Sequence, residues 1–200
     1  MKHNACTPLL FPLLLAALPL LSGCVAAAVV GVVVVADVAH DRRSTDTIVA
    51  DHNLQLTILD AIDRDPDLTR DDYRIKAVVY DSYVLLCGQA ASAQLKQRAE
   101  NVAAGFDSVK RVINEIEVTD TPQGFWSRRG DDTMTAHVKT ALLDVTSVPG
   151  FDPTRVNVTT ANSVVYLMGL VSHEEADAAA SVARTTRGVA KVVKVFEYAD

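Results

Sequence analysis

Apolar and polar residues follow the same order twice along this chain. Strand-like stretches at residues 75–79 and 156–158 each lead into a continuous apolar run, and the second copy follows the first at an offset of about 81 residues. Short polar pairs, Asp81-Ser82 and Asn162-Ser163, separate the stretches as in a tight hairpin turn. The pattern predicts two β-hairpins, with the continuously apolar second strand central in each sheet.

Helical periodicity flanks each hairpin. The positions at helical spacing are Leu54, Ile58, Leu59 and Ile62 before the first hairpin, and Met134, Val138, Lys139 and Leu142 before the second. Asp51 is the candidate N-cap of the first helix, and Asp131 or Asp132 that of the second. Each copy is therefore predicted to open with an amphipathic helix.

A second helix and a third strand complete each copy. Ser172–Glu175 has the pattern of a capping box, opening an alanine-rich helix that stops near Gly188. Its counterpart covers residues 92–105, and third strands are predicted over 109–118 and 189–198. The expected order is helix, strand, strand, helix, strand, repeated once.

The N-terminal apolar run ends in Leu21-Ser22-Gly23-Cys24, which resembles a bacterial lipobox. That resemblance implies a signal peptide over residues 1–23, cleavage, and acylation of Cys24 with a palmitate-type lipid. The alternative is an uncleaved anchor helix, which Pro12 and Pro19 disfavour because they would strain a spanning helix. Val25 stands where an inner-membrane retention signal would place Asp, which favours the outer membrane.

These features predict five segments. They are a signal peptide (1–23), a lipidated N-terminus and tether (24–51), a first domain (52–119), a linker (120–130) and a second domain (131–200).

Composition and cysteine usage restrict the classes of partner. The chain has 25 acidic and 19 basic residues, and this acidic balance argues against nucleic acid, which requires a basic face. Of its three cysteines, Cys6 leaves with the signal peptide and Cys24 is used by the anchor. Cys87 then has no intramolecular partner and is expected to be a buried structural thiol.

Motifs for catalysis or metal binding are incomplete. Asp63, Asp65 and Asp67 begin like a calcium loop, but Leu68 and Arg74 stand where the glycine and the bidentate glutamate are needed. His173-Glu174-Glu175 lacks the second histidine of a zinc-protease motif. We therefore predict no catalytic residue, no metal and no cofactor, and a protein that is not an enzyme.

The order of the elements, with Leu-Cys-Gly88 and Leu-Met-Gly169 ending the second strands, resembles BON domains. With Asp41-Arg-Arg-Ser44 in the spacer, the whole layout resembles the dual-BON outer-membrane lipoproteins (the DolP group). The resemblance implies an α+β fold of two tandem BON domains, each with helices packed on one face of a small mixed sheet. It also implies phospholipid binding, with the first helix of the second copy as the expected contact.

A basic and aromatic segment marks the expected lipid site. Phe125 and Trp126 precede Arg128 and Arg129 in the linker; such aromatics favour a membrane interface, and arginines can bind lipid phosphates. The candidate site continues into the helix with Thr133, Met134, His137 and Lys139. In the alternative, the aromatics pack between the copies and the arginines pair with acidic neighbours.

One departure from the family pattern concerns Thr133, which stands where a related lipoprotein has an aromatic residue. The linker is therefore expected to contribute to the lipid-facing surface as much as the helix does.

The function expected from the sequence is that of a lipid-anchored protein on the periplasmic face of the outer membrane. It would bind anionic phospholipid through its second domain and support envelope integrity, including at division sites and under envelope stress. The alternative is a protein-binding adaptor that docks on outer-membrane assembly proteins or on the cell wall without recognising lipid.

Overall fold

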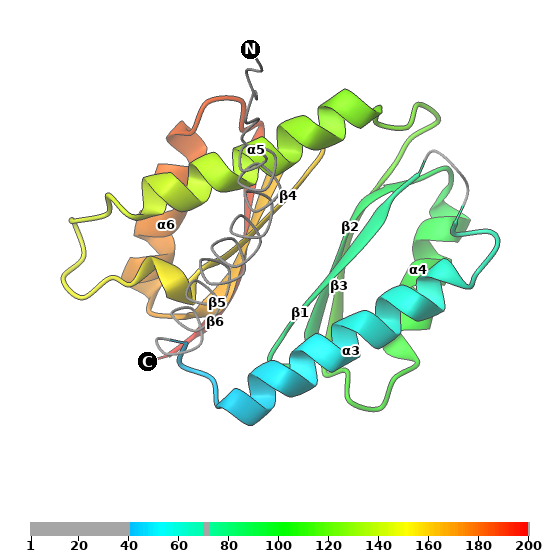
Figure 1. Cartoon of the computed structure of the whole chain (residues 1–200), viewed down its shortest axis with the longest axis horizontal. Helices are drawn as coiled ribbons and strands as arrows, with labels where there is room; N and C mark the ends of the chain where they lie inside the picture. The colour runs from blue at the N-terminus through cyan, green and yellow to red at the C-terminus, as the bar shows by residue number, and fades with distance from the viewer. Residues whose placement is uncertain (1–40, 70–72, 200) are drawn as a thin grey trace, which may run out of the picture. The chain divides into compact units, whose positions relative to one another are not determined.

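Helix, strand, strand, helix and strand occur in this order twice in the computed structural model (Figure 1). The structure describes residues 41–69 and 73–199, which lie in one compact unit from His40 to Asp200. The predicted signal peptide and the predicted lipidation site at Cys24 lie outside the described residues. Repeat 1 contains α3 (Thr45–Asp63), β1 (Ile75–Tyr80), β2 (Tyr83–Ala90), α4 (Ala93–Ala104) and β3 (Arg111–Val118). Repeat 2 contains α5 (Phe125–Leu142), a 3₁₀ turn (Pro153–Arg155), β4 (Asn157–Ala161), β5 (Val164–Val171), α6 (His173–Thr185) and β6 (Lys191–Tyr198).

Each repeat forms a three-stranded mixed sheet, in the orders β1-β2-β3 and β4-β5-β6. The hairpin strands pair antiparallel, and the third strand pairs parallel to the central one. A parallel pair needs a crossover, which α4 and α6 supply. Both helices of a repeat cover the same side of its sheet (Figure 1), so the predicted fold class is confirmed.

Alanines allow the crossover helices to lie close to the sheets. Ala99 and Ala103 of α4 are fully buried, as are four alanines of α6: Ala176, Ala179, Ala180 and Ala183. The predicted capping box is present: the Ser172 hydroxyl accepts from the Glu175 amide at 3.1 Å, and the Glu175 carboxylate accepts from the Ser172 amide at 2.7 Å.

The central strands are largely apolar because both of their faces are buried. In β2, Val84 and Leu86 belong to the core under the helices, whereas Leu85 and Cys87 belong to a second core. That second core is shared with repeat 2, which contributes Tyr166 and Met168 among others. The repeats thus bury apolar surface against each other, as expected for units near the lower size limit of a self-sufficient core.

Two aspartates connect the first helix of each repeat to its hairpin. Asp51 accepts the turn amides of Asp81 (2.6 Å) and Ser82 (2.9 Å). Asp131 accepts those of Asn162 and Ser163, both at 2.9 Å. All four turn residues have positive φ, from 45° to 65°, as a type I′ turn requires. Each buried carboxylate therefore holds the strained turn against its helix.

This arrangement overturns the predicted helix starts. The α3 helix begins at Thr45 behind a Ser44 cap, so residues 45–51 are its first turns rather than tether. The α5 helix begins at Phe125 behind Gly124. Asp51 and Asp131 thus lie inside their helices, and their predicted role as N-caps was wrong because their partners are turn amides distant in sequence.

The residues before α3 join the two repeats. The Arg43 guanidinium contacts Asp41 and Asp51, each at 2.7 Å, and lies 3.6 Å from the centre of the Tyr80 ring. The Tyr80 hydroxyl accepts the Leu170 amide of repeat 2 at 3.0 Å. The start of the described chain is therefore an integral part of repeat 1 and of its contact with repeat 2.

Arg42 extends this contact. Its guanidinium contacts both carboxylate oxygens of Glu175 at 2.9 and 3.2 Å, and donates to the Leu170 carbonyl at 3.0 Å. Burial would raise the pKa of Glu175, but the Ser172 amide and the neighbouring Arg42 and Arg155 bring it below its usual value. Glu175 is therefore held in its charged form.

Candidate functional site

The predicted lipid-binding residues lie on α5, and those whose side chains are described fall into three groups. Phe125 and Trp126 form the first turn of the helix, and their side chains lie outside what the structure describes. Gly124 provides no side-chain cap for this turn, and the turn contains no acidic residue. The remaining residues either face the core, line the outer surface, or border a hollow beside repeat 1.

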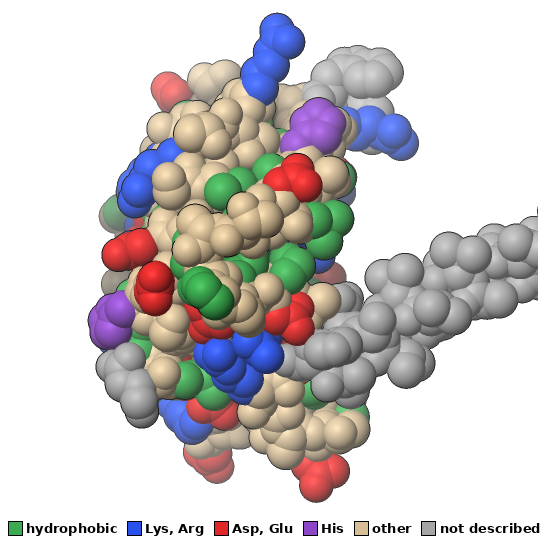
Figure 2. Space-filling model, turned by 90° about the vertical axis from the view of Figure 1, so that its left-hand side faces the viewer, with side chains coloured by type: hydrophobic (Ala, Val, Ile, Leu, Met, Phe, Trp, Pro, Cys, Tyr) green, Lys and Arg blue, Asp and Glu red, His purple; other side chains and the backbone are tan. Residues whose placement is uncertain are grey.

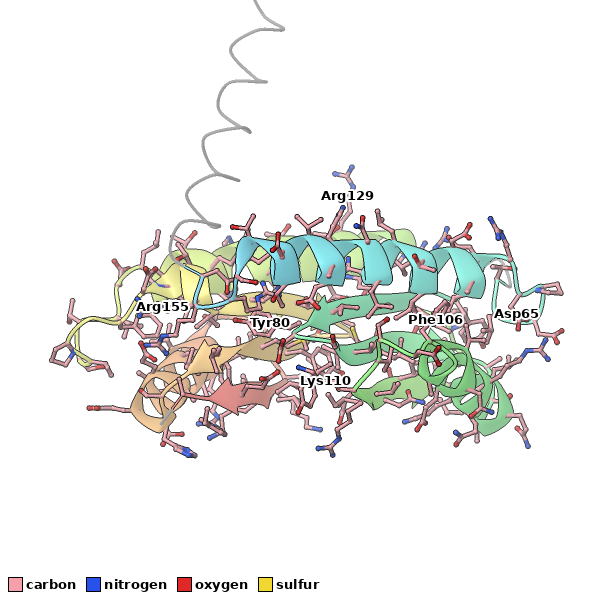
Figure 3. All side chains as sticks on the ribbon, turned by 90° about the horizontal axis from the view of Figure 1, so that it is seen from below. Asp65, Tyr80, Phe106, Lys110, Arg129 and Arg155 are labelled. Atoms are coloured by element: carbon pink, nitrogen blue, oxygen red, sulfur yellow. The ribbon has the colours of Figure 1, made fainter. Side chains whose placement is uncertain are left out.

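Met134 faces inward and packs against the core of repeat 2. Arg129, Thr133 and His137 are exposed, and their spacing of four residues places them in one row along the helix. The Thr133 hydroxyl donates to the Arg129 carbonyl at 3.0 Å, and the Arg129 side chain points away from the ribbon (Figure 3). Lys139 is also exposed. Among the described side chains of α5, the exposed ones thus include the basic Arg129 and Lys139 but no large apolar residue.

Arg128 points elsewhere, because it borders a hollow of about 20 Å³ at the junction of the repeats. Its guanidinium donates to the Gln123 carbonyl at 2.6 Å. Arg74, just before β1, and Lys76, within β1, border the same hollow. Lys76 donates to the Thr160 carbonyl at 2.9 Å and lies 3.9 Å from Asp132. Three basic side chains from two repeats therefore converge on one small space.

A glycine bends β2 beside this hollow. Gly88 has a φ of 111°, and a Cβ at this position would overlap the Arg74 carbonyl oxygen. Gly169 repeats the arrangement in β5 with a φ of 156° and the Arg155 carbonyl. These two glycines let the first strand of each hairpin start close against the second.

Arg74 and Lys76 were missed by the sequence reasoning. Arg74 directly precedes the first strand of repeat 1 and Lys76 lies within it, whereas the predicted site lies wholly in the linker and repeat 2. No periodicity or spacing relates them to Arg128, since only the packing of the two repeats brings them together.

The other reactive side chains have structural roles. Cys87 is fully buried, as predicted, and burial raises the pKa of its thiol to about 12. Asp65, at the centre of the calcium-like segment, forms ion pairs with Arg98 at 2.5 Å. Within residues 41–69 and 73–199, no group of three or more His, Cys, Asp or Glu side chains could hold a metal ion.

Charge on the surface is local in its distribution. On the face shown in Figure 2, acidic and basic side chains are interspersed and no single sign prevails. Recognition of an anion on that face would therefore depend on a small cluster rather than a broad basic field.

Comparison with known families identifies the domain family of the two repeats. Residues 50–120 and 130–200 each match the BON domain family. The chain belongs to the BON-domain family. The two matches begin within α3 and α5 and cover the rest of each helix–hairpin–helix–strand unit of the structure.

Similar proteins cover nearly the whole chain. The outer membrane lipoprotein DolP of Haemophilus influenzae is 36% identical over 188 residues, which is 94% of this chain and 95% of that protein. The 21 kDa hemolysin of Actinobacillus pleuropneumoniae is 39% identical over 158 residues, 79% of each chain. Among solved structures, the C-terminal domain of CdsD from Chlamydia trachomatis is similar with a TM-score of 0.28 and 11% identity, over 75% of this chain and 67% of that one. That last likeness is too weak to support any argument.

None of the helices in residues 41–69 and 73–199 is long and apolar enough to cross a membrane.

Proposed function

We propose that this protein is a lipoprotein of the outer membrane, anchored through Cys24 and facing the periplasm. In this proposal its second BON domain binds anionic phospholipid and the protein supports envelope integrity, including at division sites. The relationship to the outer membrane lipoprotein DolP supports the anchor and the location. The chemistry of α5 supports lipid recognition.

The outward face of α5 is the observation that carries lipid binding. This face exposes Arg129 and Lys139, and of the two aspartates of the helix one is buried on the hairpin turn. By contrast, α3 contains four aspartates and no lysine or arginine. Basic residues near an anionic surface contribute about 1 kcal/mol each. The second repeat is therefore the one suited to anionic head groups.

A weak head-group site is sufficient for an anchored protein. Each buried methylene of an acyl chain contributes about 0.8 kcal/mol to anchoring. A tether then raises the effective concentration of head groups into the millimolar range. The site on α5 would orient the domains on the membrane or respond to lipid composition, without having to hold the protein there.

Co-flotation tests the proposal. Residues 40–200, without the anchor and verified as folded by circular dichroism, are mixed with phosphatidylcholine vesicles that contain or lack phosphatidylglycerol. We expect flotation only with the anionic vesicles, loss of flotation at high salt, and weaker flotation of Arg129→Gln/Lys139→Gln. A matched control, Arg111→Gln/Arg187→Gln, removes two exposed charges outside α5. Equal flotation with both kinds of vesicle, or none, would contradict the proposal.

The second candidate function is that of a protein-binding adaptor, and the observation that favours it lies at β3 and β6. Each is an edge strand of its sheet. A hollow of about 280 Å³ lies beside them, bordered by Ile113, Val193 and Val195. An extended peptide can add to such an edge through main-chain hydrogen bonds. Site-specific cross-linking from position 113 in cells, with position 129 as the comparison, would distinguish an outer-membrane assembly partner from lipid.

A further inference from the structure

We infer that the hollow between the repeats receives a phosphate group, held jointly by Arg74, Lys76 and Arg128. The inference rests on the proposed function, because the phosphate we assign to it is that of an anionic phospholipid head group. It adds a binding site to which repeat 1 contributes, whereas the outer face of α5 belongs to repeat 2 alone.

The basic groups differ in how far they are already committed. Arg128 is half-buried and donates through one terminal nitrogen to the Gln123 carbonyl. Lys76 makes one hydrogen bond to a carbonyl, although an ammonium group has three donors. Arg74 is exposed at the mouth of the hollow. Each group therefore has donors left for a ligand, and guanidinium forks match the oxygens of a phosphate.

Two of the acidic neighbours, Asp131 and Glu117, already accept hydrogen bonds, and a third, the exposed Asp132, lies 3.9 Å from the Lys76 ammonium group. Asp131 borders the hollow, but its oxygens accept the two turn amides and one accepts the Gln123 side-chain amide at 2.9 Å. Glu117 accepts the side-chain amides of Gln89 (3.0 Å) and Asn162 (2.7 Å). Of the charged residues that border the hollow, three (Arg74, Lys76 and Arg128) are basic and one (Asp131) is acidic, which leaves the lining with an excess of positive charge.

The size of the hollow indicates which part of a lipid it takes. A space needs at least about 10–15 Å³ to hold one water molecule, so about 20 Å³ accommodates one oxygen of a phosphate. The remaining phosphate oxygens would lie at the mouth, within reach of Arg74. An acyl chain cannot enter, so the lipid would stay in its leaflet while its phosphate contacts the protein.

The walls of the hollow are held by long-range contacts. The Gln123 amide donates to the Gln89 side-chain oxygen at 2.6 Å, which ties the linker to β2. Asn162 donates to the Gly88 carbonyl at 3.2 Å, which ties the second hairpin turn to the same strand. The basic side chains therefore project from backbone positions that are fixed relative to one another, which lowers the ordering cost of binding.

Hydrogen exchange of the full lipid-anchored chain tests this inference. The protein is reconstituted into phosphatidylcholine vesicles with or without phosphatidylglycerol, and exchange is followed separately in residues 123–128 and 132–142. We expect anionic lipid to slow exchange several-fold in both segments of the wild type. In Arg74→Gln/Lys76→Gln, the protection of residues 123–128 should be lost while that of residues 132–142 remains.

Controls separate this inference from the proposed function. Arg111→Gln/Arg187→Gln removes the same charge away from the hollow and should behave like the wild type. Protection of residues 123–128 that persists in Arg74→Gln/Lys76→Gln would overturn the inference and leave the proposed function standing. No protection of either segment in the wild type would overturn both. If the double variant unfolds, Arg74→Gln alone, at an exposed position, is expected to lose part of the protection, and full retention would count against the site.

Two further arms identify the source of the phosphate. Inorganic phosphate or glycerol phosphate is added to the protein in phosphatidylcholine vesicles, with chloride at equal ionic strength as the reference. Protection of residues 123–128 by anionic lipid but not by millimolar soluble phosphate would support a head group presented by the membrane. Protection by soluble phosphate alone would overturn the assignment to lipid.

Discussion

The helices α3 and α5 occupy the same position in the two repeats but present different surfaces. Both bury an aspartate against the amides of a hairpin turn. Their outward faces differ: α3 exposes Val49 and Leu56 among acidic residues, whereas α5 exposes Arg129, His137 and Lys139. The comparison shows that the inner face of the helix builds the BON fold, while the outer face is available for function.

The two buried aspartates also differ in their third partner. Asp51 pairs with the Arg43 guanidinium, which leads to Asp41 and Tyr80. Asp131 instead accepts from the neutral side chain of Gln123, the residue that also ties the linker to β2. Repeat 1 therefore depends on an ionic contact with the entering chain, and repeat 2 on a neutral contact with the linker.

Replacing the two aspartates should give the largest losses of stability, and the loss at Asp51 should exceed the loss at Asp131. Asp51→Ala leaves two turn amides and the half-buried Arg43 without this partner, and breaking a buried ion pair costs about 3–5 kcal/mol. Asp131→Ala leaves no charged group unpaired and deprives only neutral amides of their acceptor, and each unsatisfied group costs about 1–3 kcal/mol. Urea unfolding measures both free energies. Asp60→Ala, at an exposed ion pair, is the control, and equal losses at Asp51 and Asp131 would contradict the distinction.

Replacing the strand glycines should instead give equal losses, since they belong to the shared part of the repeats. Gly88→Ala and Gly169→Ala each force a side chain at positive φ against a carbonyl oxygen, and such backbone strain costs about 1–3 kcal/mol. Gly130→Ala is the matched control because nothing lies within 4 Å of its Cβ position. It should stabilise α5 by about 0.5–1 kcal/mol. In thermal unfolding, Gly130→Ala should therefore raise the melting temperature, whereas Gly88→Ala and Gly169→Ala should lower it.

The affinity for anionic vesicles compares the outer face of α5 with that of α3. Arg129→Gln/Lys139→Gln removes two surface charges worth about 1 kcal/mol each, so affinity for anionic vesicles should fall by about thirty-fold. The change should leave stability within about 0.5 kcal/mol, as is usual for surface positions. Asp60→Gln/Asp63→Gln on α3 is the corresponding change in the other repeat. A similar change in affinity from that pair would show that net charge, rather than α5, determines binding.

Acid should lower the free energy of unfolding by weakening the ionic contacts of Asp41 and Glu175. We expect this to be the smallest of the predicted effects. Burial would raise the pKa of Asp41, but hydrogen bonds and the charge of Arg43 bring it below its ordinary 3.8, and the pKa of Glu175 lies below its ordinary 4.5. These groups bind protons more readily when unfolded, so they stabilise the fold above these ordinary values. That stabilisation is lost as pH falls from about 4.5 through the lowered values.

Urea unfolding at a series of pH values measures this dependence. The slope of unfolding free energy against pH should flatten in Arg42→Gln/Arg43→Gln, because the carboxylates then lose their partners. An unchanged slope would show that other carboxylates cause the acid sensitivity.

Local patterns in the sequence were sufficient for the elements of the fold. Alternation and apolar runs predicted the hairpins, helical spacing predicted α3 and α5, and Ser172 with Glu175 predicted a capping box that is present. These features depend on residues close together in the chain, where periodicity of three to four or of two residues is imposed by the backbone itself. The repeated order was enough to imply the BON fold.

By itself, the sequence therefore determined the repeated α+β unit, its hairpins and the basic character of α5. Only the tertiary structure decided what Asp51 does, because its partner Ser82 lies 31 positions away and the same aspartate resembles an ordinary helix cap. The tertiary structure also decided that Met134 faces the core and that Arg74 and Lys76 border the same hollow as Arg128. The physical reason is that such contacts follow from the packing of whole elements, and side chains that converge through packing leave no regular spacing in the chain.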